Sequence, residues 1–306
     1  MTWLAIVIAL LLDQLRPVPQ ARATSALAAC GRWLERRLDA GETRQGVIAW
    51  MLLVAMPGLL TLFVQAALAY WWPPLFLLLA IATLWLTMGF RQFSHHFTTI
   101  ETALQAGDLP RARAALVRWR GGEGEALTPD TLTRLSIEQA LRDSHHQVFA
   151  PLFGFVLLGP AGALIYRLSM VGAETWGGTL PNGEPRPFGL FARRAYALID
   201  WLPARLTAAT FAVVGDFEDA VYCWRTQATN WPEANEGIVL AAGAGALGVR
   251  LGGGVTEELT AGSRPELGLG DDAEPALLRS AVGLLWRALL TVMLVLTLLA
   301  LAGWVG

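Results

Sequence analysis

The sequence contains no lysine, because all 23 of its basic residues are arginines. A P-loop lysine on a nucleotide phosphate and a Schiff-base lysine are therefore excluded. Cysteine is nearly absent as well. The two cysteines, Cys30 and Cys223, have no CxxC spacing, so we predict neither a disulfide framework nor a thiolate metal site.

Charged residues are also scarce. They make up 16% of the 306 residues, whereas a soluble domain carries roughly a quarter. Hydrophobic residues make up 54% and the mean hydropathy is +0.45, which favours a lipid bilayer as the main partner of the chain. The formal net charge of −2, with no stretch that mixes basic and aromatic residues densely, argues against a nucleic-acid partner.

Long apolar runs account for this composition, and five of them approach the roughly 20 residues that a membrane-spanning helix needs. The sequence therefore predicts an all-α, polytopic transmembrane protein. A sixth apolar stretch, Thr2–Leu12, is short, and it is either a tilted first span completed by Leu15 or a half-inserted helix. The five predicted spans are Gly46–Tyr70, Leu75–Phe90, Val148–Leu168, Ala195–Gly215 and Ala288–Val305.

The distribution of arginine predicts the orientation of the chain. Asp13–Arg44 carries six arginines and Arg91–His146 carries seven, whereas the turn Trp71–Pro74 carries none. By the positive-inside rule, both arginine-rich segments are cytoplasmic and the turn is outside. We therefore expect a multi-pass protein of the bacterial inner membrane.

The segment Arg91–His146 has the pattern of a cytoplasmic helical hairpin. Asp108 precedes one helical stretch that Gly121 ends, and Thr128 precedes a second, which are typical helix start and stop signals. Three segments follow along the chain. Residues 1–90 hold the N-terminal membrane helices, 91–147 the cytoplasmic helical segment, and 148–306 the C-terminal membrane region.

Two charged residues, Asp200 and Arg205, lie inside an apolar run. Each costs about 2.5–3.5 kcal/mol at the centre of a lone membrane helix, so they need a partner or water. Pro203 between them predicts a kink at that position. Three interpretations are open: an internal ion pair, the lining of a polar cavity, or a break at the membrane surface.

The four histidines occur as two pairs, His95-His96 and His145-His146, at the ends of predicted spans. Histidine is the commonest transition-metal ligand. Adjacent helical residues point about 100° apart, however, so solvated histidines are favoured over a metal site.

Glycine and alanine dominate the segment from Ala244 to Gly253, which ends in Arg250 and a glycine run. Small residues let membrane helices approach closely, and the charge of Arg250 needs a polar partner or water. Glu236–Gly253 either spans the membrane or re-enters from the cytoplasmic side. The run Leu251–Val255 could cradle a phosphate through backbone amides, but a plain loop is favoured.

Several motifs follow one another in the C-terminal half of the chain: Ala150–Phe153, Gly159–Ala163, Pro203–Thr207, Asn235–Gly253 and Arg264–Gly268. Together they resemble the CobD/CbiB family of membrane proteins of cobalamin biosynthesis. The family's acidic and asparagine positions are occupied here by Arg142-Asp143 and His146-Gln147, and its paired aspartates by Tyr196-Ala197. A shorter segment, Asp200–Leu206 with Gly215, Glu218, Ala220 and Trp224, resembles AmpE, a membrane protein associated with cell-wall signalling.

The first resemblance implies an enzyme that joins an aminopropanol unit to a carboxyl group of a corrinoid, with ATP and Mg²⁺. Glu138 and Asp143 would then hold Mg²⁺, which prefers carboxylate oxygens, and Asn235 would orient a substrate amide or carboxyl group. Arg205 and Arg264, with Asp200, would bind substrate and phosphate.

The second resemblance implies a non-catalytic protein that senses cell-wall state. Such a protein needs the fold but not the catalytic carboxylates. It would use the cytoplasmic hairpin to bind a protein partner.

Overall fold

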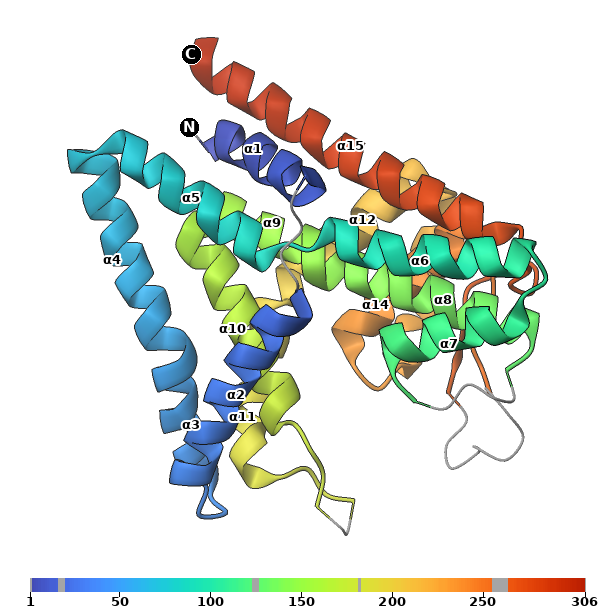
Figure 1. The fold of residues 1–306 in the computed structure, drawn as a ribbon, viewed down its shortest axis with the longest axis horizontal. Helices are drawn as coiled ribbons and strands as arrows, with labels where there is room; N and C mark the ends of the chain where they lie inside the picture. The colour runs from blue at the N-terminus through green and yellow to red at the C-terminus, as the bar shows by residue number, and fades with distance from the viewer. Residues whose placement is uncertain (1, 16–19, 123–126, 181–182, 255–263, 306) are drawn as a thin grey trace. The chain divides into compact units, whose positions relative to one another are not determined.

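The computed structural model describes residues 2–15, 20–122, 127–180, 183–254 and 264–305, and nearly all of its regular structure is helical (Figure 1). This confirms the predicted all-α class. One short antiparallel strand pair, β1 (Leu251–Gly252) and β2 (Glu266–Leu267), interrupts the helices.

The chain forms two compact units that interleave in sequence. The first comprises residues 1–90 and 147–203, and the second residues 91–146 and 204–306. This grouping differs from the three consecutive segments expected from the sequence. The assignment of those segments to the membrane or the cytoplasm stays a prediction. The helices of the first unit are α1 (Thr2–Leu15), α2 (Gln20–Leu38), α3 (Thr43–Trp50), α4 (Met56–Trp71), α5 (Pro73–Thr87), α9 (Ala150–Leu158), α10 (Pro160–Trp176) and α11 (Pro187–Ile199).

The remaining helices belong mainly to the second unit, although α6 and α12 begin in the first. They are α6 (Phe90–Gln105), α7 (Leu109–Arg120), α8 (Pro129–Ser144), α12 (Trp201–Val214), α13 (Phe217–Thr226), α14 (Ala234–Leu247) and α15 (Leu277–Val305). Two π-helical stretches, η1 (Met51–Ala55) and η2 (His145–Phe149), and one 3-10 helix, η3 (Ala228–Asn230), complete the described helical structure.

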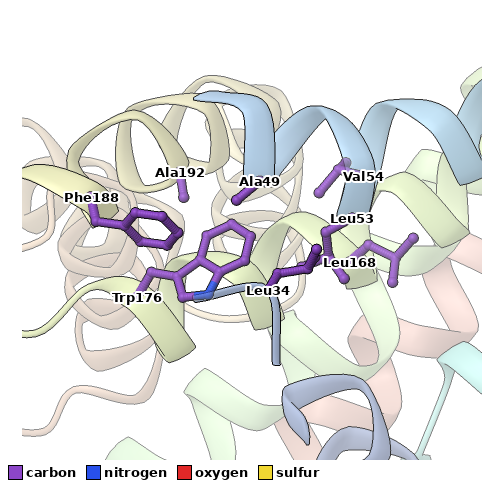
Figure 2. Packing of buried hydrophobic residues seen from close by; sticks show 8 residues of the cluster. All are labelled: Leu34, Ala49, Leu53, Val54, Leu168, Trp176, Phe188 and Ala192. Atoms are coloured by element: carbon purple, nitrogen blue, oxygen red, sulfur yellow. The ribbon is translucent and has the colours of Figure 1, made fainter. Parts of the chain in front are cut away.

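Trp176 lies at the centre of the core of the first unit (Figure 2). Its ring is fully buried and meets the edge of Phe188, with 5.5 Å between the ring centroids. Its indole N–H donates a 3.0 Å hydrogen bond to the carbonyl oxygen of Gly31. A buried tryptophan needs such a partner for its one polar atom, so α2 and α10 are joined at a fixed position.

Within the described residues, two helices are long and apolar enough to cross a membrane. The continuous helix Thr43–Trp71 covers the predicted span Gly46–Tyr70, and Leu277–Ala302 covers most of the span predicted at Ala288–Val305. The pair α11–α12 counts as a third candidate if the two helices form one broken span. The helices α1, α5 and α14 are apolar but have only 14 or 15 residues, or about 22 Å.

The segment Val148–Leu168, predicted as one span, is instead a tight helical hairpin. A methyl group at Gly154 would lie 2.9 Å from the carbonyl oxygen of Gly162, and one at Gly162 would lie 2.0 Å from that of Gly154. Residues eight apart in a continuous helix are about 12 Å apart, so the chain folds back between α9 and α10. The prediction of a single span was wrong because Gly159, with φ of +65°, permits a turn that hydropathy does not reveal.

A single polar side chain of α4 completes this turn. The Gln65 amide donates to the carbonyl oxygen of Leu158 at 2.9 Å, and its oxygen accepts from the backbone N–H of Ala161 at 3.0 Å. These backbone groups flank the break, where helical hydrogen bonds end. Gln65 therefore satisfies the groups that an apolar environment would leave without water.

Replacing Gln65 with leucine removes both of these hydrogen bonds. We expect Gln65→Leu to lower the free energy of unfolding by about 1–3 kcal/mol, because the buried backbone N–H of Ala161 and the carbonyl oxygen of Leu158 both lose their partner. Unfolding by denaturing detergent in mixed micelles measures the change. Phe63→Leu, at a side chain 75% exposed on the same helix, is the matched control, and an equal effect of both substitutions would contradict the proposed role of Gln65.

The run Ala195–Gly215 is broken at Asp200 and not at Pro203. Helix α11 ends at Ile199 and α12 begins at Trp201. Pro203 lies in the first turn of α12, where a missing N–H breaks no helical hydrogen bond. The run is bent, by 44°, as predicted, but the bend lies at Asp200, because Pro203 is in the first turn of α12 and does not interrupt a helix.

The expected helical pair between residues 91 and 146 is present as α7 and α8. Asp108 accepts a hydrogen bond from the backbone N–H of Arg111 at 3.1 Å and so caps α7, and Thr128 caps α8 in the same way. Ala112, Leu116 and Leu132 are buried in the core between these helices and α6. Helix α8 is buried on nearly all sides, whereas a helix of a hairpin on the protein surface is buried on one side only.

Helix α14 lies in the middle of the second unit. Every residue from Gly237 to Ala246 is buried. A methyl group at Gly245 would lie 2.4 Å from the carbonyl oxygen of Asp219, so glycine permits the close packing of α13 on α14. The small residues of this segment therefore bring helices together as expected, while the choice between a spanning and a re-entrant path stays a prediction.

Candidate functional site

The candidate site is a network of ionic side chains in the second unit, built around α8. Arg134, Glu138 and Arg142 are spaced four residues apart and so lie on one face of this helix. Glu138 is only 2% exposed, although it carries a carboxylate. A buried charge of this kind is strongly unfavourable unless cations and hydrogen-bond donors surround it.

Three groups surround the Glu138 carboxylate. The backbone N–H of Gly252 donates to one oxygen at 2.8 Å, the Arg264 guanidinium donates to the other, and Arg120 lies 3.8 Å away. Gly252 has φ of +77°, and a methyl group there would lie 2.0 Å from the carbonyl oxygen of Pro265. Only glycine therefore allows this backbone to reach Glu138 and to pair with β2.

A second ion pair joins α8 to α14. The Arg142 guanidinium donates to Glu236, which also accepts a 3.0 Å hydrogen bond from the indole N–H of Trp231. The Arg264 guanidinium lies over the Trp231 ring, 5.0 Å from its centroid, a cation–π contact. The two ion pairs are thus parts of one network.

The charges of Arg142 and Glu236 shift the pKa of each residue in the direction that favours its ionised form. Burial by itself raises the pKa of Glu236, but the charge and hydrogen bond of Arg142 outweigh it and the net pKa is lowered. Burial likewise opposes ionisation of Arg142, but the Glu236 carboxylate outweighs it and raises the pKa of Arg142. Both groups therefore remain charged at neutral pH.

Asn235 and Arg205, two residues predicted from the sequence, lie together. A guanidinium nitrogen of Arg205 donates to the Asn235 side-chain oxygen at 3.5 Å, a long hydrogen bond. Because Asn235 precedes Glu236 on α14, this pair adjoins the ionic network. The structure therefore brings Asn235 and Arg205 together, as it does Glu138 and Arg264.

Asp143 has different partners. Its two carboxylate oxygens accept hydrogen bonds from the indole N–H of Trp119 at 2.7 Å and from the Gln139 amide at 3.0 Å. Five residues along a helix correspond to roughly 140° of rotation, so Asp143 does not lie on the same face of α8 as Glu138. The two predicted carboxylates therefore point in different directions.

Asp200 belongs to the first unit, where it is 2% exposed. The Tyr166 hydroxyl donates to its carboxylate at 3.0 Å, and the hydroxyl groups of Tyr166 and Tyr196 are 3.2 Å apart. Tyr196 stands where the CobD/CbiB resemblance expects an aspartate. Tyr196 thus contacts Tyr166, whose hydroxyl group donates to the buried Asp200 carboxylate.

The histidines occupy separate environments. His145 is buried and its Nδ1 lies 2.9 Å from the Thr207 hydroxyl, whereas His96 stacks on Trp119 with 6.0 Å between the ring centroids. Among the residues that the structure describes, no three His, Cys, Asp or Glu side chains are grouped as a metal site needs.

Comparison with known proteins identifies the family. Residues 6–285 match the family described as CobD/Cbib protein. The chain belongs to the CobD/CbiB family. No solved structure was found to match it.

Curated members of the CobD/CbiB family cover most of the chain. The protein named cobalamin biosynthesis protein CobD of Stutzerimonas stutzeri is 35% identical over 93% of both chains. The protein of the same name in Chromobacterium violaceum is 39% identical over 65% of this chain and 63% of its own length. The Rhodobacter capsulatus protein, again of that name, is 29% identical over 84% of this chain and 81% of its own.

The departure from the CobD/CbiB pattern at Arg142 has a structural explanation. The family pattern has an acidic residue at this position, but here the guanidinium pairs with Glu236 and acts on Glu138. Arg142 therefore extends the ionic network, and its own charge is compensated by Glu236.

The carboxylates that the CobD/CbiB resemblance assigns to Mg²⁺ do not fit that ion. Both oxygens of Glu138 and both oxygens of Asp143 already accept hydrogen bonds. The two groups also lie on different faces of α8. Since Mg²⁺ requires near-octahedral oxygen ligands, these carboxylates are better placed to hold arginine and tryptophan side chains.

Sequence analysis missed several members of the network, although one signal was available. Arg134, Glu138 and Arg142 repeat at a spacing of four residues in a helix that is otherwise largely buried. Charges at this spacing on a buried face need partners elsewhere in the chain. Glu138 itself was predicted, and the members that were missed are Arg134, Arg142, Arg120, Trp119, Trp231, Glu236, Gln139 and Gly252.

The Arg142–Glu236 pair makes stability depend on pH. Because the pKa of Glu236 is lowered by folding, the pair stabilises the protein above the ordinary carboxyl pKa of 4.5, and this is lost as pH falls through the lower folded-state value. We expect Glu236→Gln to lower stability by about 3 kcal/mol at pH 7.

Thermal unfolding in detergent between pH 3 and pH 7 measures this effect. The midpoints of wild type and Glu236→Gln should converge as the pH falls below 4.5. Glu218→Gln, at an exposed residue of α13, is the control. A constant difference between wild type and Glu236→Gln over the whole range would disprove the role of the ion pair.

Proposed function

We propose that this chain acts in cobalamin biosynthesis as an amide ligase that joins an aminopropanol unit to a carboxyl group of a corrinoid. The observation that carries the proposal is the 35% identity, over 93% of both chains, to a protein named cobalamin biosynthesis protein CobD. The match along nearly the whole chain supports a shared function more strongly than a match of one motif.

Amide formation places clear demands on such a site. A free carboxylate is a poor electrophile, so a group from ATP must first be transferred to it. Transfer of the phosphoryl group releases ADP, and transfer of the nucleotidyl group releases pyrophosphate. The amine then attacks the carbonyl carbon, the C–N bond forms, and the C–O bond to the leaving phosphate breaks. The nitrogen gives up a proton to water, so the products are an amide and a phosphate compound.

The chain supplies groups suited to the charge that develops in this reaction. Guanidinium groups bind phosphoryl oxygens in a bidentate way, and Arg264 and Arg205 are proposed for this role. Asn235 is proposed to orient the substrate carboxyl or amide group through its side-chain amide. Glu138 then positions Arg264, while Asp143 positions Trp119, and Asp200 stays a proposed substrate contact within the first unit.

We further propose that the protein is a multi-pass protein of the bacterial inner membrane, with the arginine-rich segment 91–146 on the cytoplasmic side. The two long apolar helices and the distribution of arginine support this orientation. ATP and a corrinoid intermediate would then reach the second unit from the cytoplasm.

An alternative is a non-catalytic, AmpE-like protein that reports cell-wall state to a cytoplasmic partner. The engagement of Glu138 and Asp143 in internal hydrogen bonds supports it, because both carboxylates are used to hold the structure. The experiment that tests the enzyme also separates the two proposals.

The test is complementation of a bacterial strain that lacks its own corrinoid amide ligase. We expect the wild-type chain to restore cobalamin-dependent growth, and Asn235→Ala to reduce the amide-forming rate about tenfold or more, as the loss of one transition-state hydrogen bond does. Arg279→Gln, at an arginine whose side chain is 75% exposed, is the control. Absence of growth with wild-type protein that is inserted in the membrane would refute the ligase and favour the sensor.

A further inference from the structure

We propose that Arg120, Arg134, Arg142 and Arg264 together form a binding site for a phosphoryl group, beside the glycine run Gly252–Gly254 and organised by Glu138. Only Arg264 among these was expected from the sequence to bind phosphate. The anion site stands independently of the reaction, while the identity of the phosphoryl compound rests on the proposed function.

Each of the four arginines has a guanidinium nitrogen that is buried and has no hydrogen-bond partner. These atoms are Nη1 of Arg120, Nε of Arg134, Nε of Arg142 and Nη1 of Arg264. Buried donors in folded proteins are almost always satisfied. Four unsatisfied donors of one chemical kind in one network indicate that an acceptor belongs there.

The four side chains come from three separate segments of the second unit and converge on Glu138. Arg264 donates to this carboxylate and Arg120 lies 3.8 Å from it. Arg134 and Arg142 lie one turn before and one turn after it on the same face of α8. Arg134 also donates to the carbonyl oxygen of Gly254 at 2.7 Å, which connects the glycine run to the arginines.

The glycine run is shaped for close approach. Gly252 and Gly253 both have positive φ, and nothing lies within 4 Å of a methyl group placed on Gly254. The Gly252 backbone N–H is already directed to Glu138. A ligand beside this loop would therefore meet backbone on one side and guanidinium groups on the other.

Cations outnumber the carboxylates that hold them in this part of the network. Three of the four arginines, Arg120, Arg142 and Arg264, have direct ion-pair contacts, and these involve only two acidic residues, Glu138 and Glu236. Burial is the main reason that the pKa of Arg120 is lowered, and the charges of Arg264 and Arg142 lower it further against the opposing effect of Glu138. An added anion would relieve both the burial cost and the repulsion.

The arrangement favours a phosphoryl group over a carboxylate. A phosphate presents three or more acceptor oxygens, whereas a carboxylate presents two and could satisfy fewer of the four donors. Guanidinium groups also remain charged at every physiological pH and match phosphate oxygens with paired N–H groups. A free phosphate compound and a lipid headgroup share this chemistry, and the experiment separates them.

The test measures binding of inorganic phosphate, pyrophosphate and ATP to the full chain in phosphatidylcholine nanodiscs by isothermal titration calorimetry. We expect saturable binding of at least one of them, and none of acetate at the same concentration. Arg120→Gln and Arg134→Gln should each weaken binding about tenfold, a loss of about 1.4 kcal/mol. Arg279→Gln, at an exposed arginine paired with Glu101, should leave it unchanged.

Several outcomes overturn the proposal: no binding of any of the three compounds, equal binding by wild type and both variants, or equal binding of acetate. If Arg120→Gln does not fold, Arg120→Lys keeps the charge and should still weaken binding, because lysine lacks the paired donors. Nanodiscs that contain phosphatidylglycerol compete for the site if its ligand is a headgroup and leave affinity unchanged if it is a free phosphate compound. Binding without complementation would refute the ligase alone, and complementation without binding would refute this site alone.

Discussion

The second unit depends on the compensation of one buried carboxylate. Glu138 lies inside α8 with almost no exposure, and its charge is stable there only because Gly252, Arg264 and Arg120 surround it. These three come from β1, the segment before β2 and the end of α7. A single ionic requirement thus determines where several distant parts of the chain meet.

Much of the architecture could be predicted from the sequence. Hydropathy led to the all-α class and the two long apolar helices, and helix start and stop signals led to the helices on either side of Gly121. Glycine and proline positions were harder to interpret. Gly159 turns the chain back beside Gln65, which lies far away in sequence, and Pro203 lies in the first turn of a helix that begins at Trp201.

The site was predictable in part, and the reason is physical. Motif resemblance selected Glu138, Asn235, Arg205 and Arg264, and the structure joins these residues in pairs. It also led to the expectation that Glu138 and Asp143 share a metal, which their positions around α8 do not fit. The partners Glu236 and Trp231 could not be inferred, because the packing of α14 on α8 determines them and no local pattern encodes it.

The Gln65 hydrogen bonds have a consequence for how this chain folds while it is being synthesised. Gln65 and Leu158 are 93 residues apart, so α4 leaves the ribosome well before the hairpin that its side chain completes. Until α9 and α10 arrive, the Gln65 amide has neither of these partners, and an amide without partners is unfavourable in lipid. Insertion of α4 and folding of the later hairpin are therefore coupled, and the first unit reaches its final state only after residues 147–203 have been made.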